Sequence, residues 1–136
     1  MIAKLLVTIL LLIGVLHLYW AMGQHAGDSA VVPSVDGKPL FQPSQRATVA
    51  VAFALFSAAT VVAIRSGIVS VPALAFLAAI GCWGLVAVFG LRAIGDFRYL
   101  GFFKRVTGTR FARADTLVYS PLCAVLAAMA ATVALG

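Results

Sequence analysis

Four long apolar stretches dominate this chain and restrict the folds that it can adopt. They run over residues 2–22, 47–64, 72–94 and 116–135. Each has close to the ~20 residues that a helix needs to cross a bilayer, and a backbone in lipid must satisfy its own hydrogen bonds. None shows the alternation that is typical of a barrel strand. The sequence therefore predicts an all-α integral membrane protein, a four-helix antiparallel bundle.

Composition agrees with this prediction. Hydrophobic residues make up 63% of the chain and charged residues 10%, whereas a soluble domain has about 45–50% apolar and about 25% charged residues. Four spans and their loops use the whole length, so we expect residues 1–136 to form a single transmembrane domain. The first apolar stretch is too long for the apolar region of a typical signal peptide, and we expect it to be a span as well.

The positions of the basic residues predict an orientation. Four spans place both termini on one side of the membrane, and loops 23–46 and 95–115 on the other. The two loops hold most of the basic residues: Lys38, Arg46, Arg98, Lys104, Arg105, Arg110 and Arg113. The positive-inside rule then predicts cytoplasmic loops and outward-facing termini, with Lys4 as a small opposing term.

The segment RAIGDFRYLGFFKRVTGTRFARAD, residues 92–115, carries six of the ten basic residues together with several aromatic residues. One interpretation is membrane anchoring, with rings in the apolar layer and cations among phosphates. The other is a site for an anionic amphiphile, in which arginines bind a phosphate or carboxylate. In both cases the expected partners are membrane lipids with anionic headgroups, and not nucleic acid.

Residues from distant parts of the sequence are expected at one membrane level. In the predicted topology, His17 and Trp20 near the end of span one lie level with Arg92 at the end of span three. A shared polar pocket would then contain ligand-binding residues Trp20, Arg92, Arg98, Tyr99, Lys104, Arg105, Arg110 and Tyr119. Proton handling is assigned to His17, Asp96 and Asp115.

Simpler roles are open for the same residues. His17 can bond to a neighbouring helix or reach the interface, and Trp20 fits an interfacial aromatic belt. Arg92 and Asp96 are spaced for an ion pair within one helix. Ser120, before Pro121, is expected to cap a helix.

Metal and cofactor chemistry are not expected. The chain has four acidic residues and two histidines, too few neighbouring ligands for a zinc or iron site. Cys82 and Cys123 fall in separate spans without a redox motif, and we expect them to be packing residues. Gly81, Gly84 and Gly90 would allow close helix approach.

Three segments resemble a known family. They are HLYW at residues 17–20, GKPLFQPS at 37–44 and RAIGDFRYLGFFKRVTGTRFARADTLVYSPLC at 92–123. They resemble the small bacterial membrane proteins of domain-of-unknown-function family 3995. The resemblance implies a four-span protein of the bacterial inner membrane and implies no activity.

Three hypotheses about function follow, and the sequence leaves open whether the protein is an enzyme. The preferred one is binding of an anionic amphiphile, lipid or isoprenoid-like, in an interfacial pocket, with or without a reaction on it. An alternative is a small transporter or channel that works as a homodimer. A third is an assembly or regulatory subunit that docks on a protein partner through its basic loop.

Overall fold

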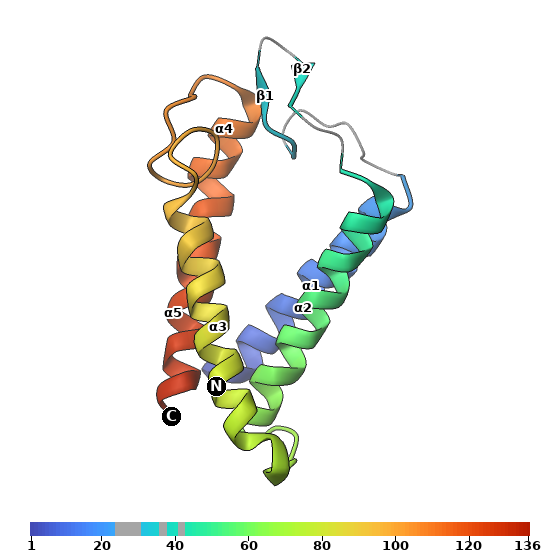
Figure 1. Cartoon of the computed structure of the whole chain (residues 1–136), viewed down its shortest axis with the longest axis vertical. Helices are drawn as coiled ribbons and strands as arrows, with labels where there is room; N and C mark the ends of the chain where they lie inside the picture. Colours follow the sequence, from blue (N-terminus) through green and yellow to red (C-terminus); the bar gives the residue numbers. More distant parts are fainter. Residues whose placement is uncertain (24–30, 36–37, 41–42) are drawn as a thin grey trace.

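The protein forms four long helices, seen here in a computed structural model that describes residues 1–23, 31–35, 38–40 and 43–136. They are α1 (Ile2–Ala21), α2 (Gln45–Arg65), α3 (Ala75–Ile94) and a continuous fourth helix made of α4 (Arg110–Ala114), the π-helical turn η2 (Asp115–Tyr119) and α5 (Ser120–Leu135). A 3₁₀ turn, η1 (Pro72–Leu74), leads into α3. All four are long and apolar enough to cross a membrane. The predicted all-α, four-helix antiparallel bundle of a multi-pass membrane protein is confirmed (Figure 1).

Side-chain caps fix where two of the helices begin. The hydroxyl of Ser44 accepts a hydrogen bond from the Ala47 amide at 3.1 Å, at the start of α2. The hydroxyl of Thr109 accepts one from the Ala112 amide at 3.0 Å. Such caps satisfy amides that lack a partner in the first turn. The fourth helix therefore begins at Arg110, before the apolar stretch that starts at residue 116.

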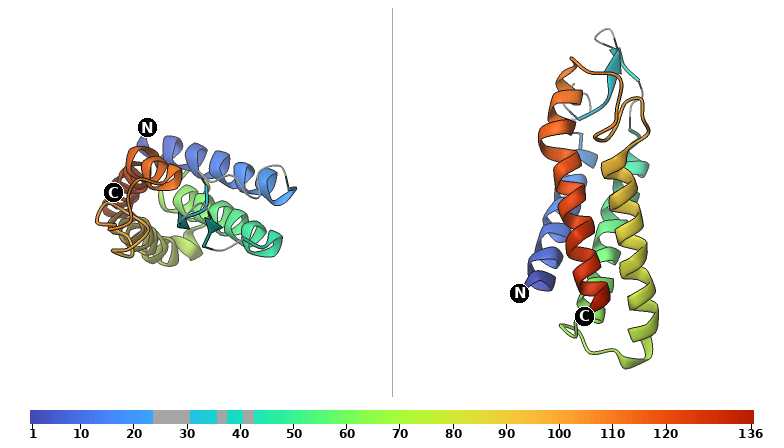
Figure 2. Two further views of the ribbon diagram at one scale, coloured as in Figure 1. Left: turned by 90° about the horizontal axis from the view of Figure 1, so that it is seen from above. Right: turned by 90° about the vertical axis from the view of Figure 1, so that its left-hand side faces the viewer.

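The helices pack as two pairs, α1 with α2 and α3 with α5 (Figure 1). The pairs meet at the end that carries both termini and diverge toward the other end, as the view from above in Figure 2 also shows. The buried core lies where they meet and draws on all four helices, with fully buried Leu6, Leu10, Val62, Cys82 and Ala130 among its members. Packing thus holds one end of the bundle together more tightly than the other.

Close helix approach depends on two glycines. A Cβ at Gly14 would lie 2.5 Å from the Phe56 ring, and one at Gly81 would lie 2.7 Å from Val61 Cγ1. No atom lies within 4 Å of a Cβ built at Gly84 or Gly90. Of the three glycines expected to allow close approach, only Gly81 therefore does so.

The two long connections lie at the end opposite the termini (Figure 1). In the first, β1 (Ser34–Val35) and β2 (Lys38–Pro39) form a short antiparallel pair with Ser34 opposite Pro39. In the second, the chain turns back on α3, because the Phe102 amide donates to the Ala93 carbonyl at 2.9 Å. This return brings the loop after α3 against the start of the fourth helix.

Candidate functional site

A single buried carboxylate organises the loop end of the α3–α5 pair. Asp115 is fully buried. Its Oδ1 accepts a hydrogen bond from Arg92 Nη2 at 2.8 Å. Its Oδ2 accepts three, from the Gly101 amide at 2.8 Å, Lys104 Nζ at 3.0 Å and the Ser120 hydroxyl at 3.1 Å. We call these five residues the Asp115 centre.

Lys104 is almost entirely enclosed in this centre. Its side chain is 3% exposed. Besides Asp115, its ammonium donates to the Gly101 carbonyl at 2.9 Å and to the Thr116 hydroxyl at 2.7 Å. Three acceptors match the three N–H bonds of an ammonium group, so its hydrogen-bonding capacity is used up.

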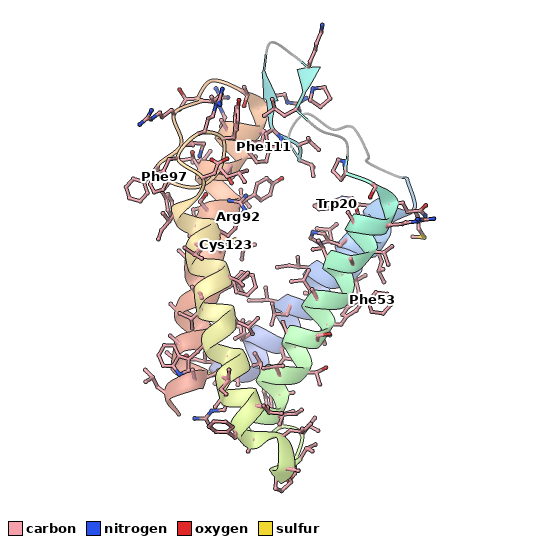
Figure 3. All side chains as sticks on the ribbon, in the orientation of Figure 1. Trp20, Phe53, Arg92, Phe97, Phe111 and Cys123 are labelled. Carbon is pink, nitrogen blue, oxygen red and sulfur yellow. The ribbon has the colours of Figure 1, made fainter. Side chains whose placement is uncertain are left out.

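Arg92 is satisfied only in part. Its Nη2 pairs with Asp115, and its side chain is 30% exposed. Its Nη1 is buried and has no hydrogen-bond partner within the part of the chain that the structure describes. Figure 3 draws this side chain on the side of α3 that faces the α1–α2 pair. The centre therefore combines two cations with one carboxylate and retains an unsatisfied guanidinium nitrogen.

The π-helical turn explains why Ser120 can reach Asp115. The two residues are five positions apart, and in an α-helix such residues point in different directions. The wider turn at Asp115–Tyr119 brings them together. It ends just before Pro121, which cannot donate a backbone hydrogen bond within the helix. The expected capping role of Ser120 is therefore wrong, because its hydroxyl is a buried donor to the carboxylate.

Two glycines allow the loop that covers Asp115 to close. Gly95 and Gly101 have φ angles of 92° and 83°, a region that side chains rarely adopt. A Cβ on Gly95 would overlap the Leu100 carbonyl, and a Cβ on Gly101 would overlap the Ile94 carbonyl. Only glycine fits at either position. This contact places the Gly101 amide on Asp115.

Asp96 shapes the same loop from outside the helix. Its Oδ1 accepts hydrogen bonds from the amides of Arg98, Tyr99 and Leu100 at 2.9, 2.7 and 2.9 Å. Slight desolvation acts to raise the pKa of Asp96, but these bonds, that of Leu100 first, outweigh it and lower the pKa below its ordinary value. The alternative of an Arg92–Asp96 ion pair is wrong, because Arg92 pairs with Asp115.

His17 and Trp20 lie on the other helix pair. A carbonyl can only accept, so His17 Nδ1 donates to the Ile13 carbonyl, at 2.8 Å. The bond is within α1 and not to a neighbouring helix. The His17 and Trp20 rings are 5.1 Å apart. Trp20 also lines a cavity of about 330 Å³ with Val32 and Thr48, and Arg92 is not among the lining residues. The pocket that the two sets were expected to share stays a prediction.

The remaining candidate residues lie on the loop after α3 and on the first turns of the fourth helix. The Arg98 guanidinium lies 5.0 Å from the centre of the Tyr99 ring. The ring of Tyr119 lies 6.1 Å from that of buried Phe111. Arg105 and Arg110 are exposed. Among the residues that the structure describes, no three His, Cys or Asp side chains gather in a way that could hold a metal ion.

Comparison with known proteins identifies the family. The family model described as "Protein of unknown function (DUF3995)" matches residues 10–130. The chain belongs to this family. The predicted resemblance is thereby confirmed, and the matched region includes every candidate residue from His17 to Tyr119. No curated protein and no solved structure matches the chain.

Proposed function

We propose that this family member binds an anionic amphiphile at the loop end of its membrane domain, with Arg92 of the Asp115 centre as the anchor for the anionic group. The ligand has a phosphate or carboxylate headgroup and an apolar tail, such as a lipid or an isoprenoid-like molecule. The tail lies in the bilayer, and the headgroup lies at the level where α3 ends.

The charge balance of the Asp115 centre carries the proposal. Lys104 and Arg92 bring two positive charges to one carboxylate. Burying a charge without an opposite partner is costly, and an unpaired buried donor adds to that cost. An anion on Arg92 Nη1 offsets both. Asp115 does not do so, because its Oδ1 pairs with Nη2 and leaves Nη1 without a partner among the described residues.

Aromatic side chains provide a suitable setting for the apolar part of the ligand. Phe97, Phe102 and Phe103 are 57%, 48% and 63% exposed, on a loop that returns to the level of Ala93 and Ile94. Rings at this level fit the boundary between headgroups and hydrocarbon, where aromatic residues are enriched.

The geometry supports binding better than catalysis. Asp96 and Asp115, two of the residues assigned to proton handling, act as hydrogen-bond acceptors for the loop and its cations. Asp96 has a lowered pKa, which is the wrong direction for a general base or acid near neutral pH. His17 belongs to the other helix pair.

The proposal is tested by measuring which lipids stay bound to the purified protein. Native mass spectrometry of protein taken from phosphatidylcholine bilayers doped with phosphatidylglycerol should show retained phosphatidylglycerol. In an Arg92→Gln variant retention should fall about tenfold, since a charge-assisted hydrogen bond contributes about 1.5–3 kcal/mol.

Arg46→Gln is the matched control. It removes the same charge from an exposed residue at the same end of the molecule, on α2. If both variants retain phosphatidylglycerol as the unchanged protein does, the proposal is wrong.

We also propose that the protein lies in the bacterial inner membrane with its long loops in the cytoplasm. The basic residues of those loops support this orientation. A Thr107→Cys variant should react with a membrane-impermeant maleimide in inside-out vesicles, and a Ser70→Cys variant in spheroplasts. The reverse pattern would contradict the orientation. The unchanged protein, with both cysteines inside spans, is the control for background labelling.

A further inference from the structure

We infer that a second lipid site lies on the outer face of the fourth helix, where Arg110 and Arg113 bind the phosphate of an anionic glycerophospholipid and Leu117 and Val118 contact its acyl chain. This site goes beyond the function proposed above, because it uses no residue of the Asp115 centre.

A groove marks the place. It has a volume of about 410 Å³ and is lined by Gly108, Thr109, Arg110, Arg113, Leu117 and Val118, with Ala114. Drug-sized ligands occupy pockets of about 300–1,000 Å³, so a headgroup and the start of a chain fit. No atom lies within 4 Å of a Cβ built at Gly108, which leaves that end of the groove open.

The groove lies on the face of the helix that points away from the Asp115 centre. Phe111 and Asp115, four positions apart, are buried. Arg110 and Arg113 follow the i, i+3 spacing of a different stripe, and Leu117 lines the same groove. Leu117 is 70% exposed. The two stripes of this helix therefore have different roles. The stripe with Phe111 and Asp115 packs against the protein and its loop, and the stripe with Arg110 and Arg113 faces the lipid.

The positive charge of Arg110 and Arg113 makes their end of this stripe a site for an anion. No ion pair joins Arg110 or Arg113 to a carboxylate among the described residues. Asp96 and Asp115 are engaged elsewhere. Two cations one turn apart repel each other. A phosphate between them removes the repulsion and accepts hydrogen bonds from both guanidinium groups.

Depth in the membrane favours a lipid phosphate as the occupant. The helix from Asp115 to Leu135 consists of the five-residue π-helical turn and the 16 residues of α5. At ~1.5 Å per residue its length is about 30 Å, close to the thickness of the hydrocarbon layer. If the boundary lies at Asp115, Arg113 and Arg110 lie ~3 Å and ~7.5 Å beyond it. The headgroup layer is about 5–7.5 Å thick on each side, so Arg113 lies inside it and Arg110 at its outer edge.

Leu117 and Val118 lie just inside the same boundary. One stripe of the helix therefore passes from guanidinium groups to apolar side chains where a glycerophospholipid passes from phosphate to acyl chain. A free phosphate ion would occupy only the half of the groove that Arg110 and Arg113 line, and would leave the apolar half empty.

Native mass spectrometry of the detergent-solubilised protein titrated with phosphatidylglycerol tests the inference. Arg110→Gln with Arg113→Gln should weaken one lipid-binding step about tenfold, by the loss of charge-assisted hydrogen bonds. Lys38→Gln with Arg46→Gln removes the same charge from exposed residues at the same end and should leave that step unchanged. Equal loss in both double variants, or in neither, overturns the inference.

Two further variants separate a shaped site from general attraction to anionic lipid. Arg110→Lys with Arg113→Lys keeps the charge but lacks the planar fork of arginine, and binding should still weaken several-fold. Leu117→Trp fills the groove without changing the charge and should also weaken binding, at an unchanged melting temperature. Full binding by either variant overturns the site as described.

Soluble competitors identify the source of the phosphate. Inorganic phosphate and glycerol 3-phosphate should not displace phosphatidylglycerol. Displacement by either shows a site for free phosphate compounds, and the lipid assignment fails. The Arg92→Gln variant distinguishes the two proposals. It should weaken a different lipid-binding step from the one that the Arg110 and Arg113 variants weaken. If only one of the two steps is weakened, only the other proposal fails.

Discussion

At the scale of single residues, Asp115 and Asp96 show how one type of side chain serves two purposes. Asp115 is fully buried and compensates cations, while Asp96 is exposed and accepts only backbone amides. Removing the charge of Asp115 leaves buried cations without an opposite charge, and removing that of Asp96 weakens a turn in contact with water. The two aspartates are therefore a natural pair of positions for comparison.

We expect Asp115→Asn to lower the free energy of unfolding by about 3 kcal/mol or more, because breaking a buried ion pair leaves the partner charge uncompensated. Melting of the detergent-solubilised protein measures the effect. The same chemical change at Asp96 is the control and should cost much less. Equal melting temperatures for the two variants would contradict the role assigned to Asp115.

Asp96 predicts a pH dependence. Its pKa is lowered in the folded protein, so its contribution is present in full above the ordinary aspartate pKa of about 4 and is lost as pH falls through the folded-state pKa. The stability difference between the unchanged protein and Asp96→Asn should therefore shrink on acidification. A difference that grows as pH falls would contradict the hydrogen bonds seen at Arg98, Tyr99 and Leu100.

At the scale of elements, the loop between α3 and α4 depends on its glycines. Gly101 combines a positive φ with close backbone contact, whereas Gly108 has a φ of 90° and open space around it. Gly101→Ala should therefore lower the melting temperature and speed proteolysis of the loop. Gly108→Ala carries only the backbone strain, and its effect should be smaller. Equal effects would show that the contact with Ile94 is unimportant.

The same loop marks where prediction from sequence succeeds and fails. Hydropathy predicts the four helices, because a span must be apolar along its length. The sequence also singles out Arg92, Lys104 and Asp115, since charges near spans are costly. It does not predict that they pair, because their meeting depends on the turn from Gly95 to Gly101.

Two other residues that contact Lys104 or Asp115 could not be predicted from the sequence, for related reasons. Thr116 binds Lys104, and its only signal in the sequence is that it follows Asp115. Ser120 reaches Asp115 through a π-helical turn, and a spacing of five residues matches no regular helix period. Pro121 is the one local sign that the helix is irregular there.

At the scale of the whole molecule, packing is concentrated at one end. The core from Leu6 to Ala134 lies where the helix pairs meet. The loop between α3 and α4, which covers Asp115, lies at the opposite end (Figure 1). The two regions should respond separately to substitution. Changes at the core act on the association of the helix pairs, and changes at the Asp115 centre act on the loop.

Gly81 offers a test of how the pairs associate. A Cβ there would press on Val61 of α2, whereas a Cβ at Gly84 would contact nothing within 4 Å. Both Gly→Ala changes gain about 1 kcal/mol of helix propensity, so their difference isolates the contact. We expect Gly81→Ala to melt at a lower temperature than Gly84→Ala. The opposite order would show that α2 and α3 can separate freely at this level.

The position of the Asp115 centre also has a consequence for biosynthesis. In the proposed orientation, the six cations between Arg92 and Arg113 stay on the side of the ribosome, and none has to cross the bilayer, where each would cost about 2.5–3.5 kcal/mol at mid-depth. Asp115 leaves the ribosome after all of them and begins the last span. The ion pairs therefore cannot form before the start of the last span has left the ribosome, so the loop after α3 closes late in synthesis.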